Sequence, residues 1–341
     1  MRDRPRLIDG VPIPLIATDE TARITAANPA AEALFGPGMA GRPFVTVIRQ
    51  PGINAALEAA LSTGSGQGLR ATVTGVGREI VAEIAAAPIE GGALVSFQDI
   101  SALDHAEAMR RDFVANVSHE LRTPLTALMG FIETLRGPAR DDAAARDRFL
   151  GIMAREAGRM NRLVADLLSL SRVEAEERRR PSGRVDVAAL IRGAAATLRP
   201  QAEADGVVIA LQGLDDPIAV PGDADQLTQL FTNLIENALK YGGSGGWVGI
   251  TLTRVAHEAA LRGPAVQVEV ADRGEGIEAI HLPRLTERFY RVDSHRSREQ
   301  GGTGLGLAIV KHIVNRHRGR LRVTSTRGTG TQFTVSLPEG R

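Results

Sequence analysis

The sequence predicts a multidomain α+β protein with three parts, at residues 1–100, 101–177 and 178–341. Short strand-like and helix-like segments alternate in the first and last parts, whereas the middle part shows only helical periodicity. The segment RVEAEERRRPSGR, which begins at the end of the middle part and continues into the last part, has the composition of a charged linker. A chain of 341 residues suits two or three compact units, each with its own core.

In the first part, alternating apolar residues between turn signals predict five strands and two short helices. The strands are expected at 14–18, 23–28, 69–75, 79–89 and 92–100, and the helices at 29–36 and 55–64.

The middle part predicts two long amphipathic helices joined by a short loop. Apolar residues three or four positions apart form a stripe on the first helix: Val114, Val117, Leu121, Leu125, Leu128, Ile132 and Leu135. Gly137-Pro138 interrupts the pattern before a similar stripe begins at Phe149. A single hairpin leaves part of such stripes uncovered, so we expect two copies of the chain to form a four-helix bundle as a homodimer.

The last part mixes both periodicities. Helices are expected at 223–242 and 304–317, strands at 247–255 and 265–273, and a closing hairpin at 319–328 and 330–338.

Composition excludes several classes of function. The net charge of +1 provides no general attraction to nucleic acid, so no direct nucleic-acid contact is expected. The absence of cysteine excludes disulfides and thiolate metal sites. No apolar run approaches the ~18 residues of a membrane span, so we expect a soluble, cytoplasmic chain. Neither Lys240 nor Lys311 follows glycine, which excludes a P-loop.

The string FVANVSHELRTPLTALMGF carries the first chemical pattern. At 100° per residue, His119 points away from the apolar face of Val117 and Leu121, and Thr123 lies one turn further on the exposed side. Glu120 can accept a proton or hydrogen bond from the imidazole. Pro124 removes an amide donor, so a bend is expected there.

An exposed histidine in a proline-containing helix is the simpler reading of a bare His-Glu pair, but the whole string SHELRTPLT favours function. It resembles the phosphoacceptor motif of sensor histidine kinases. The resemblance implies phosphorylation at His119, a base at Glu120, and at Thr123 a hydroxyl that helps water to dephosphorylate the partner. That partner would be the receiver domain of a cognate response regulator.

The predicted helix in LFTNLIENALKYG separates an apolar face from a polar one. Asn233, Asn237 and Lys240 are each about a turn apart on the polar face. Amide oxygens are reasonable Mg²⁺ ligands and an ammonium suits phosphate oxygens, although two asparagines on a solvated face would be unremarkable alone.

Two glycine-bearing segments follow. In DRGEGI, Asp272 can accept a hydrogen bond from an exocyclic amine, and Gly274 and Gly276 let backbone approach a flat ring. In GGTGLGLAIV, the alternate glycines precede a helix, where free amides and the helix dipole favour phosphate. These glycines are Gly302, Gly304 and Gly306. Their spacing is not that of the dinucleotide-binding fingerprint.

Together, these segments resemble the ATP-binding domain of the histidine kinases, the GHKL-type α/β sandwich shared with gyrase, the Hsp90 chaperones and the mismatch-repair ATPases. The resemblance implies ATP and Mg²⁺ as cofactors. It implies adenine recognition by Asp272, magnesium at Asn237, phosphate contact by Lys240 and ring packing by Tyr241. It also implies a lid at about 273–303 that contains Phe289.

The first part resembles a PAS sensor domain through IPLIATDETARITAANPAAEALFG. All seven histidines lie at or beyond His105, which argues against histidine-ligated haem, and a flavin–thiol adduct is impossible without cysteine. A structural relay and a small-molecule sensor both stay open.

Within the family, PRLTERFYRVD and SREQGGTGLGLAIVKH are most similar to the phosphate-regulon sensor kinases, which respond to phosphate limitation and usually carry a membrane anchor. One alternative is an ATP-hydrolysing clamp of the GHKL type. It needs a general-base glutamate one turn before the magnesium asparagine, where this chain has Asn233. A non-catalytic adaptor would need a damaged site, and every expected polar residue is present.

Overall fold

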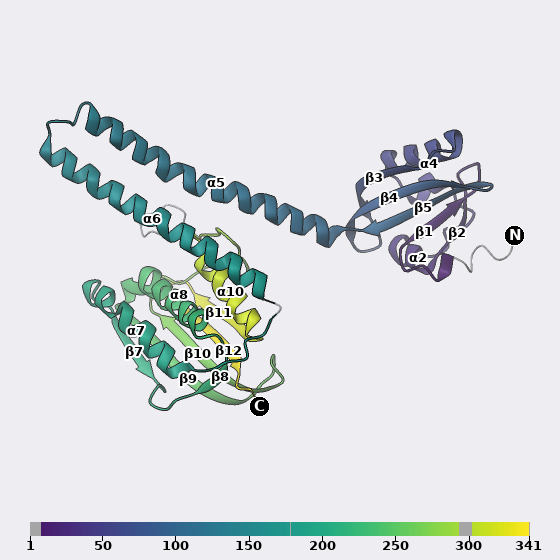
Figure 1. The fold of residues 1–341 in the computed structure, drawn as a ribbon. Coiled ribbons are helices and arrows are strands. Elements are labelled where there is room, and N and C mark those ends of the chain that lie inside the picture. The colour runs from purple at the N-terminus through teal and green to yellow at the C-terminus, as the bar shows by residue number, and fades with distance from the viewer. Residues whose placement is uncertain (1–7, 178, 293–301, 341) are drawn as a thin grey trace. The chain divides into compact units, whose positions relative to one another are not determined.

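A computed structural model of the chain describes residues 8–177, 179–292 and 302–340 (Figure 1). The chain divides into two compact units, residues 1–115 and 116–341.

The first unit is built on a five-stranded antiparallel sheet with the strand order β2-β1-β5-β4-β3. Its strands are β1 (Leu15–Thr18), β2 (Ile24–Ala27), β3 (Gln67–Thr74), β4 (Glu79–Ile89) and β5 (Gly92–Asp99). Its short helices are α2 (Pro29–Phe35), α3 (Phe44–Val47) and α4 (Pro51–Thr63). The expected strands are therefore confirmed, and alternate residues of β4 and β5 are buried as the pattern requires.

The side chain of buried Asn28 connects the start of α2 to β1 through hydrogen bonds. Its side-chain Oδ1 caps α2 by accepting from the Ala31 amide at 2.9 Å, and it also accepts from the Leu15 amide at 2.9 Å. Phe44 and Phe97 fill the core beside it and are fully buried.

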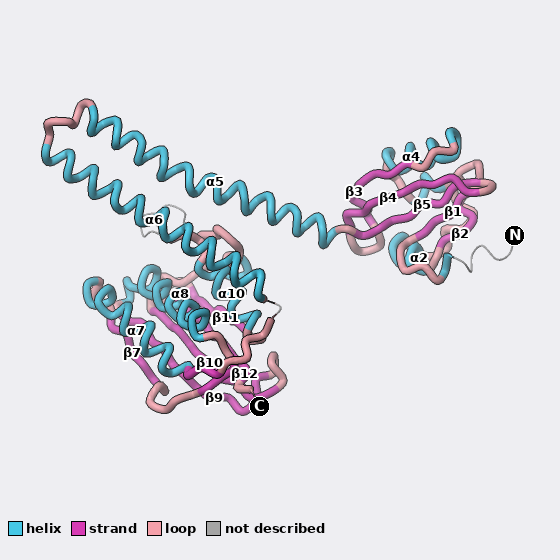
Figure 2. The backbone as a smooth tube through the Cα atoms, in the orientation of Figure 1, coloured by secondary structure: helices cyan, strands magenta, loops and turns pink. Residues whose placement is uncertain are grey.

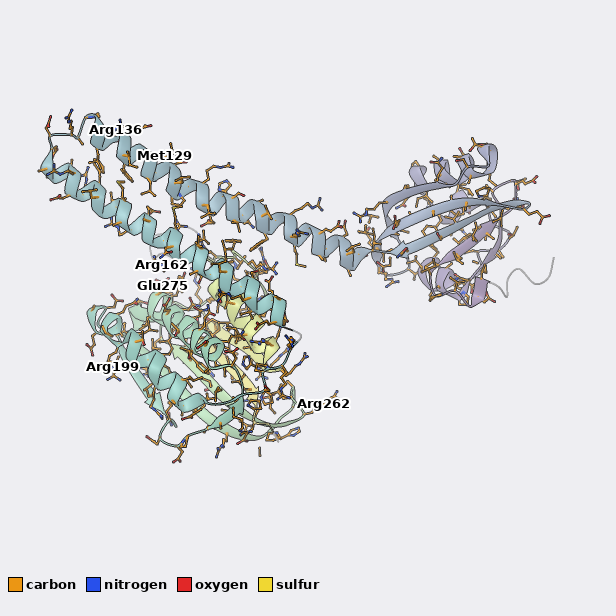
Figure 3. The ribbon with its side chains drawn as sticks, in the orientation of Figure 1. Met129, Arg136, Arg162, Arg199, Arg262 and Glu275 are labelled. Carbon is orange, nitrogen blue, oxygen red and sulfur yellow. The ribbon has the colours of Figure 1, made fainter. Side chains whose placement is uncertain are left out.

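The hairpin consists of α5 (Ser101–Arg136) and α6 (Ala143–Glu176). The expected pair of long helices is confirmed, and α5 continues through buried Pro124 as one helix. The rings of Phe131 and Phe149 stack across the hairpin at 5.3 Å between centroids. Several apolar side chains of α5 remain exposed, including Leu125 at 50%, Met129 at 56% and Ile132 at 44%. Figure 3 labels Met129 on this helix.

The remainder of the second unit is a two-layer α/β sandwich. Its five-stranded sheet has the order β11-β12-β10-β9-β7, in which only the β7–β9 pair is parallel. The strands are β7 (Val208–Gln212), β9 (Trp247–Glu258), β10 (Gly263–Asp272), β11 (Arg320–Thr326) and β12 (Gly330–Pro338). Helices α7 (Val187–Ala204), α8 (Ala224–Gly242) and α10 (Gly306–Arg316) cover one face (Figure 2). A small ladder joins β6 (Arg184–Asp186) to β8 (Ala219–Pro221).

Helix α8 is the central helix of this layer. Its predicted apolar face, Leu227, Phe231, Leu234 and Ala238, is buried in the sandwich. Asp223 begins the helix by accepting from the Gln226 amide at 3.2 Å. Because the apolar face is fixed against the sheet, the opposite polar face is only partly covered.

Candidate active site

His119 and Thr123 lie on the exposed side of α5, as the helical spacing predicts. The Thr123 hydroxyl donates to the carbonyl oxygen of His119 at 3.2 Å. This bond back to the preceding turn is common for threonine in helices, and it leaves the lone pairs of the hydroxyl available to accept a hydrogen bond.

The neighbouring carboxylate of Glu120 has different partners from those that the sequence suggests. Its Oε2 accepts from Arg159 of α6 at 2.7 Å and from Arg291 at 3.1 Å, and the side chain is 18% exposed. Hydrogen bonds between two ionised groups are about twice as strong as neutral ones, so the two guanidinium groups hold this carboxylate firmly. In this arrangement, the structure pairs Glu120 with arginines and not with the ring of His119.

A second cluster surrounds Asp272 at the end of β10. Its Oδ1 accepts from the backbone amides of Gly274 at 2.9 Å and Thr331 at 3.2 Å. Burial raises the pKa of Asp272, and the two amide hydrogen bonds oppose that shift. A half-buried carboxylate fixed in this way still has Oδ2 available to accept from a ligand.

Two glycines make room around Asp272. A Cβ on Gly242, the last residue of α8, would lie 2.2 Å from the Asp272 Cβ. A Cβ on Gly274 would lie 2.5 Å from the Gly242 Cα. Only glycine allows β10 and the end of α8 to approach this closely.

The sequence prediction included Gly274 but missed both Gly242 and Thr331. The Gly-Gly pair after Tyr241 was a usable signal for Gly242. No local pattern marks Thr331, which contacts Asp272 through its backbone across 59 residues.

The polar face of α8 borders the glycine-rich turn before α10. The Asn233 amide donates to the Gly306 carbonyl at 3.4 Å. The Lys240 ammonium pairs with Glu236 at 3.0 Å, one turn away on the same helix. Asn237 lies between them and is half-buried. The structure therefore brings Asn233 and Gly306 together and places Asn237 and Lys240 along the same helix.

The glycine-rich turn also contacts the segment ERFYRVD. The Phe289 amide donates to the Gly304 carbonyl at 2.8 Å, and Gly304 has a φ of +73°. Gly276 has a φ of +68°, and a Cβ there would lie 2.2 Å from the Thr326 oxygen. Of the predicted lid, residues 293–301 lie outside the described residues. Gly302 precedes the turn, and Tyr241 at the end of α8 is 40% exposed.

Three family models match separate stretches of the chain. Residues 6–63 match a PAS domain, and residues 109–176 match the His Kinase A (phospho-acceptor) domain. Residues 222–341 match the histidine kinase-, DNA gyrase B- and HSP90-like ATPase. The chain belongs to the sensor histidine kinases.

Among its relatives is the phosphate regulon sensor protein PhoR of Pseudomonas aeruginosa, 42% identical over 245 residues, which cover 71% of this histidine kinase and 53% of PhoR. The sensor-like histidine kinase SenX3 of Mycolicibacterium smegmatis is 41% identical over 249 residues, 72% of this chain and 62% of SenX3. The chain thus spans between half and two thirds of the length of these relatives.

One solved structure, the histidine kinase ThkA in complex with the response regulator protein TrrA, matches with a TM-score of 0.51 and 19% identity. It covers 98% of this chain and 97% of that one. Another, the Acinetobacter baumannii histidine kinase AdeS, matches with a TM-score of 0.50 and 24% identity, covering 65% and 98%. At these identities, both comparisons establish the fold. Within the described residues, no helix is both long and apolar enough to cross a bilayer.

Proposed function

We propose that this histidine kinase transfers the γ-phosphoryl group of ATP to His119, and then to an aspartate in the receiver domain of a response regulator. The observation that carries the proposal is the Glu120–Arg291 contact. Arg291 follows Phe289 and Tyr290 in the segment that contacts the glycine-rich turn. A residue of the ATP-binding domain therefore reaches the residue next to an exposed histidine.

The nucleotide site fits a purine triphosphate. Asp272 offers a carboxylate oxygen to an exocyclic amine, while Gly242, Gly274 and Gly276 let the segments around it pack closely, because a Cβ at each would clash with neighbouring atoms. Tyr241 precedes Gly242 at the end of α8 and Phe289 donates its amide to Gly304, so both aromatic residues adjoin the proposed site. At the phosphate end lie Lys240 and the turn with Gly302, Gly304 and Gly306.

Asn237 has the oxygen donor that Mg²⁺ prefers, and Asn233 fixes the neighbouring turn through Gly306. A bound Mg²⁺ would neutralise charge on the phosphates. Such a site uses one or two protein oxygens and the phosphates themselves, so it needs no cluster of carboxylates.

In the first transfer, an imidazole nitrogen of His119 forms a bond to the γ-phosphorus while the bond from that phosphorus to the ADP oxygen breaks. The attacking nitrogen uses its lone pair, and the proton on the other ring nitrogen goes to the Glu120 carboxylate. Glu120 must exchange an arginine contact for the imidazole, so Arg159 and Arg291 control when the base is available.

The proposed working parts are the sensor domain at 1–100, the phosphoacceptor hairpin at 101–177 and the catalytic domain at 178–341. The exposed apolar residues of α5 support a homodimer through a four-helix bundle. Thr123 would support a second activity, the dephosphorylation of the regulator. The likeness to PhoR supports a role in the response to phosphate limitation.

Incubation with γ-labelled ATP and Mg²⁺ tests the proposal. The protein should acquire an acid-labile, alkali-stable label, and a panel of receiver domains should then identify the acceptor. His119→Gln should abolish the label and retain nucleotide binding, because the side chain is exposed and distant in sequence from the nucleotide residues. Normal labelling of His119→Gln would refute the proposal.

A further inference from the structure

Helix α6 carries a face that packs against the ATP-binding domain. Leu163, Leu170 and Val173 are the buried residues of α6 among those described, and they recur at intervals of three or seven. Such spacing places them on one side of the helix. Polar residues on that side of α6 pair with the ATP-binding domain at both ends of the face.

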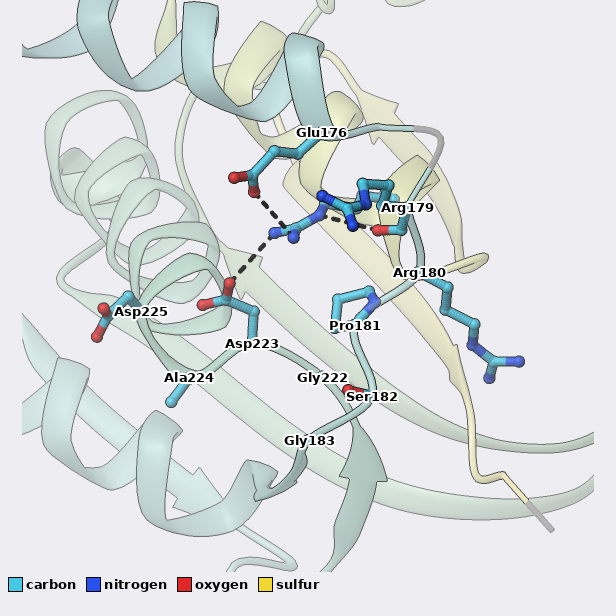
Figure 4. Close-up of a pocket in the computed structure, with 11 residues that line it drawn as sticks. Glu176, Arg179, Arg180, Pro181, Ser182, Gly183, Gly222, Asp223, Ala224 and Asp225 are labelled. Atoms are coloured by element: carbon cyan, nitrogen blue, oxygen red, sulfur yellow. Dashed lines mark hydrogen bonds and ion pairs between the residues drawn. The ribbon is translucent and has the colours of Figure 1, made fainter.

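The end of this face near the linker is ionic. Glu174 accepts from Arg288 at 2.6 Å, and Glu177 contacts His312 of α10 at 2.7 Å. Arg316 bridges Glu176 at 2.8 Å and Asp223 at 3.2 Å, beside a polar cleft (Figure 4). These pairs are partly buried and Arg316 is the most enclosed of their members, so several charged contacts together hold this end of the face.

The other end of the face bears Asp166. Its Oδ2 accepts from the hydroxyl of Thr303 at 2.6 Å. This distance is typical of a hydroxyl that donates to an ionised carboxylate. Thr303 is buried and lies between Gly302 and Gly304, in the turn that leads into α10. A carboxylate of the hairpin is therefore attached directly to the turn proposed to receive phosphate.

Charged residues on the polar face of α8 act on the Asp166 carboxylate. Burial raises the pKa of Asp166, and the Thr303 hydrogen bond lowers it. Glu236 adds to the increase, whereas Lys240 and Arg162 oppose it. Glu236 pairs with Lys240, the lysine proposed for the phosphate end of the site.

We propose that Asp166 is a positioning residue that makes docking on α6 and binding of a nucleoside polyphosphate oppose each other. This inference rests on the proposed function. While docked, Asp166 holds the glycine-rich turn through Thr303 and keeps a negative charge beside the phosphate position. A polyphosphate repels that charge and competes for the turn, so loading of the nucleotide favours release of the ATP-binding domain from α6. Release is also what gives the domain freedom to present the γ-phosphate to His119.

The first test compares two ligands by isothermal titration with the full chain. Asp166→Asn keeps an oxygen that accepts from Thr303 but removes the charge. It should bind the non-hydrolysable analogue AMPPNP about fivefold more tightly, as expected for one charge screened at the edge of a site. Adenosine has no phosphate and should bind equally to both proteins. A purely structural role for Asp166 would shift both ligands together.

Asp225→Asn is the matched control, because it makes the same substitution at an exposed position in the first turn of α8. It should leave both affinities unchanged. Unchanged AMPPNP affinity in Asp166→Asn, or an equal gain for adenosine, would overturn the inference. Wild-type protein that fails to bind AMPPNP would instead refute the proposed function.

The second test uses the absence of cysteine from the chain. The double variant Asp166→Cys, Thr303→Cys places two thiols at the docked contact, and a disulfide between them, verified by mass spectrometry without reductant, locks that contact. The oxidised protein should bind AMPPNP at least about tenfold more weakly than the same protein after reduction. Equal affinities of the cross-linked and reduced forms would contradict the antagonism between docking and nucleotide binding.

Discussion

Substitution of Gly242 by alanine should disable the nucleotide site through a single methyl group. The added Cβ would lie 2.2 Å from the Cβ, 2.3 Å from the Cγ and 2.7 Å from the Oδ1 of Asp272. Contacts this short to atoms next to the backbone force Asp272 or the end of α8 to move. Gly242 itself has a φ of −102°, which alanine tolerates, so the effect is steric.

The cost has two components. Forcing an extra methyl group into a packed site costs about 1–3 kcal/mol. Rotation of Asp272 away from it sacrifices the hydrogen bonds from Gly274 and Thr331, and hydrogen bonds to a charged group contribute about 1.5–3 kcal/mol each. We therefore expect a loss of at least about 1.4 kcal/mol in nucleotide binding, which is tenfold in affinity. A fall of several degrees in the melting temperature should accompany it.

The adjacent glycine provides the control. A Cβ on Gly243 would meet Val207 Cγ2 at 3.5 Å, an ordinary contact, and Gly243 has helical φ and ψ angles. Gly243→Ala should therefore bind AMPPNP like the wild type in isothermal titration. If Gly242→Ala also retains wild-type affinity, or if both variants lose it equally, the steric argument is incorrect.

Three further predictions follow from the hairpin and the nucleotide site. Thr123→Ala should keep most autokinase activity but lose phosphatase activity toward the regulator by ~100-fold. Glu120→Ala should reduce the rate of the kinase step more than that of the phosphatase step. Both rates should be measured on proteins shown to have equal helix content, and an equal loss of both activities in Thr123→Ala would contradict this division of roles. Because burial raises the pKa of Asp272, its ionised form destabilises the fold at neutral pH, and this effect disappears as the pH falls through the folded and then the unfolded pKa. Asp272→Asn should therefore melt at a higher temperature than the wild type at pH 7, and the difference between the two melting temperatures should shrink toward pH 4. The variant should also bind nucleotide poorly. A melting temperature below that of the wild type at pH 7 would contradict this reasoning. Ile132→Asp should convert the dimer to monomer in light scattering, because it places a charge on the exposed apolar surface of α5, and an unchanged dimer mass would exclude that surface.

Local sequence indicated most of the elements, although it did not mark α3, α7 or the strands β6, β7 and β8, and it indicated part of each site. The apolar periodicity of α8 determines which face is buried, and so which face presents Asn233, Asn237 and Lys240. The same reasoning places His119 and Thr123 on the exposed side of α5. Alternation likewise indicated the strands β4, β5 and β10. These features depend on neighbours within a few residues, which a single sequence displays directly.

The partners of the charged residues were decided only by the tertiary structure. Glu120 joins Arg159 and Arg291, which are 39 and 171 residues away, and Asp166 joins Thr303 across 137 residues. In the sequence, Glu120 and Asp166 cannot be distinguished from other acidic residues on a solvated helix. The residue type does not indicate which distant part of the chain will pack over each carboxylate. Helix periodicity fixes the direction of a side chain, but the packing of α6 against the ATP-binding domain determines what that side chain meets.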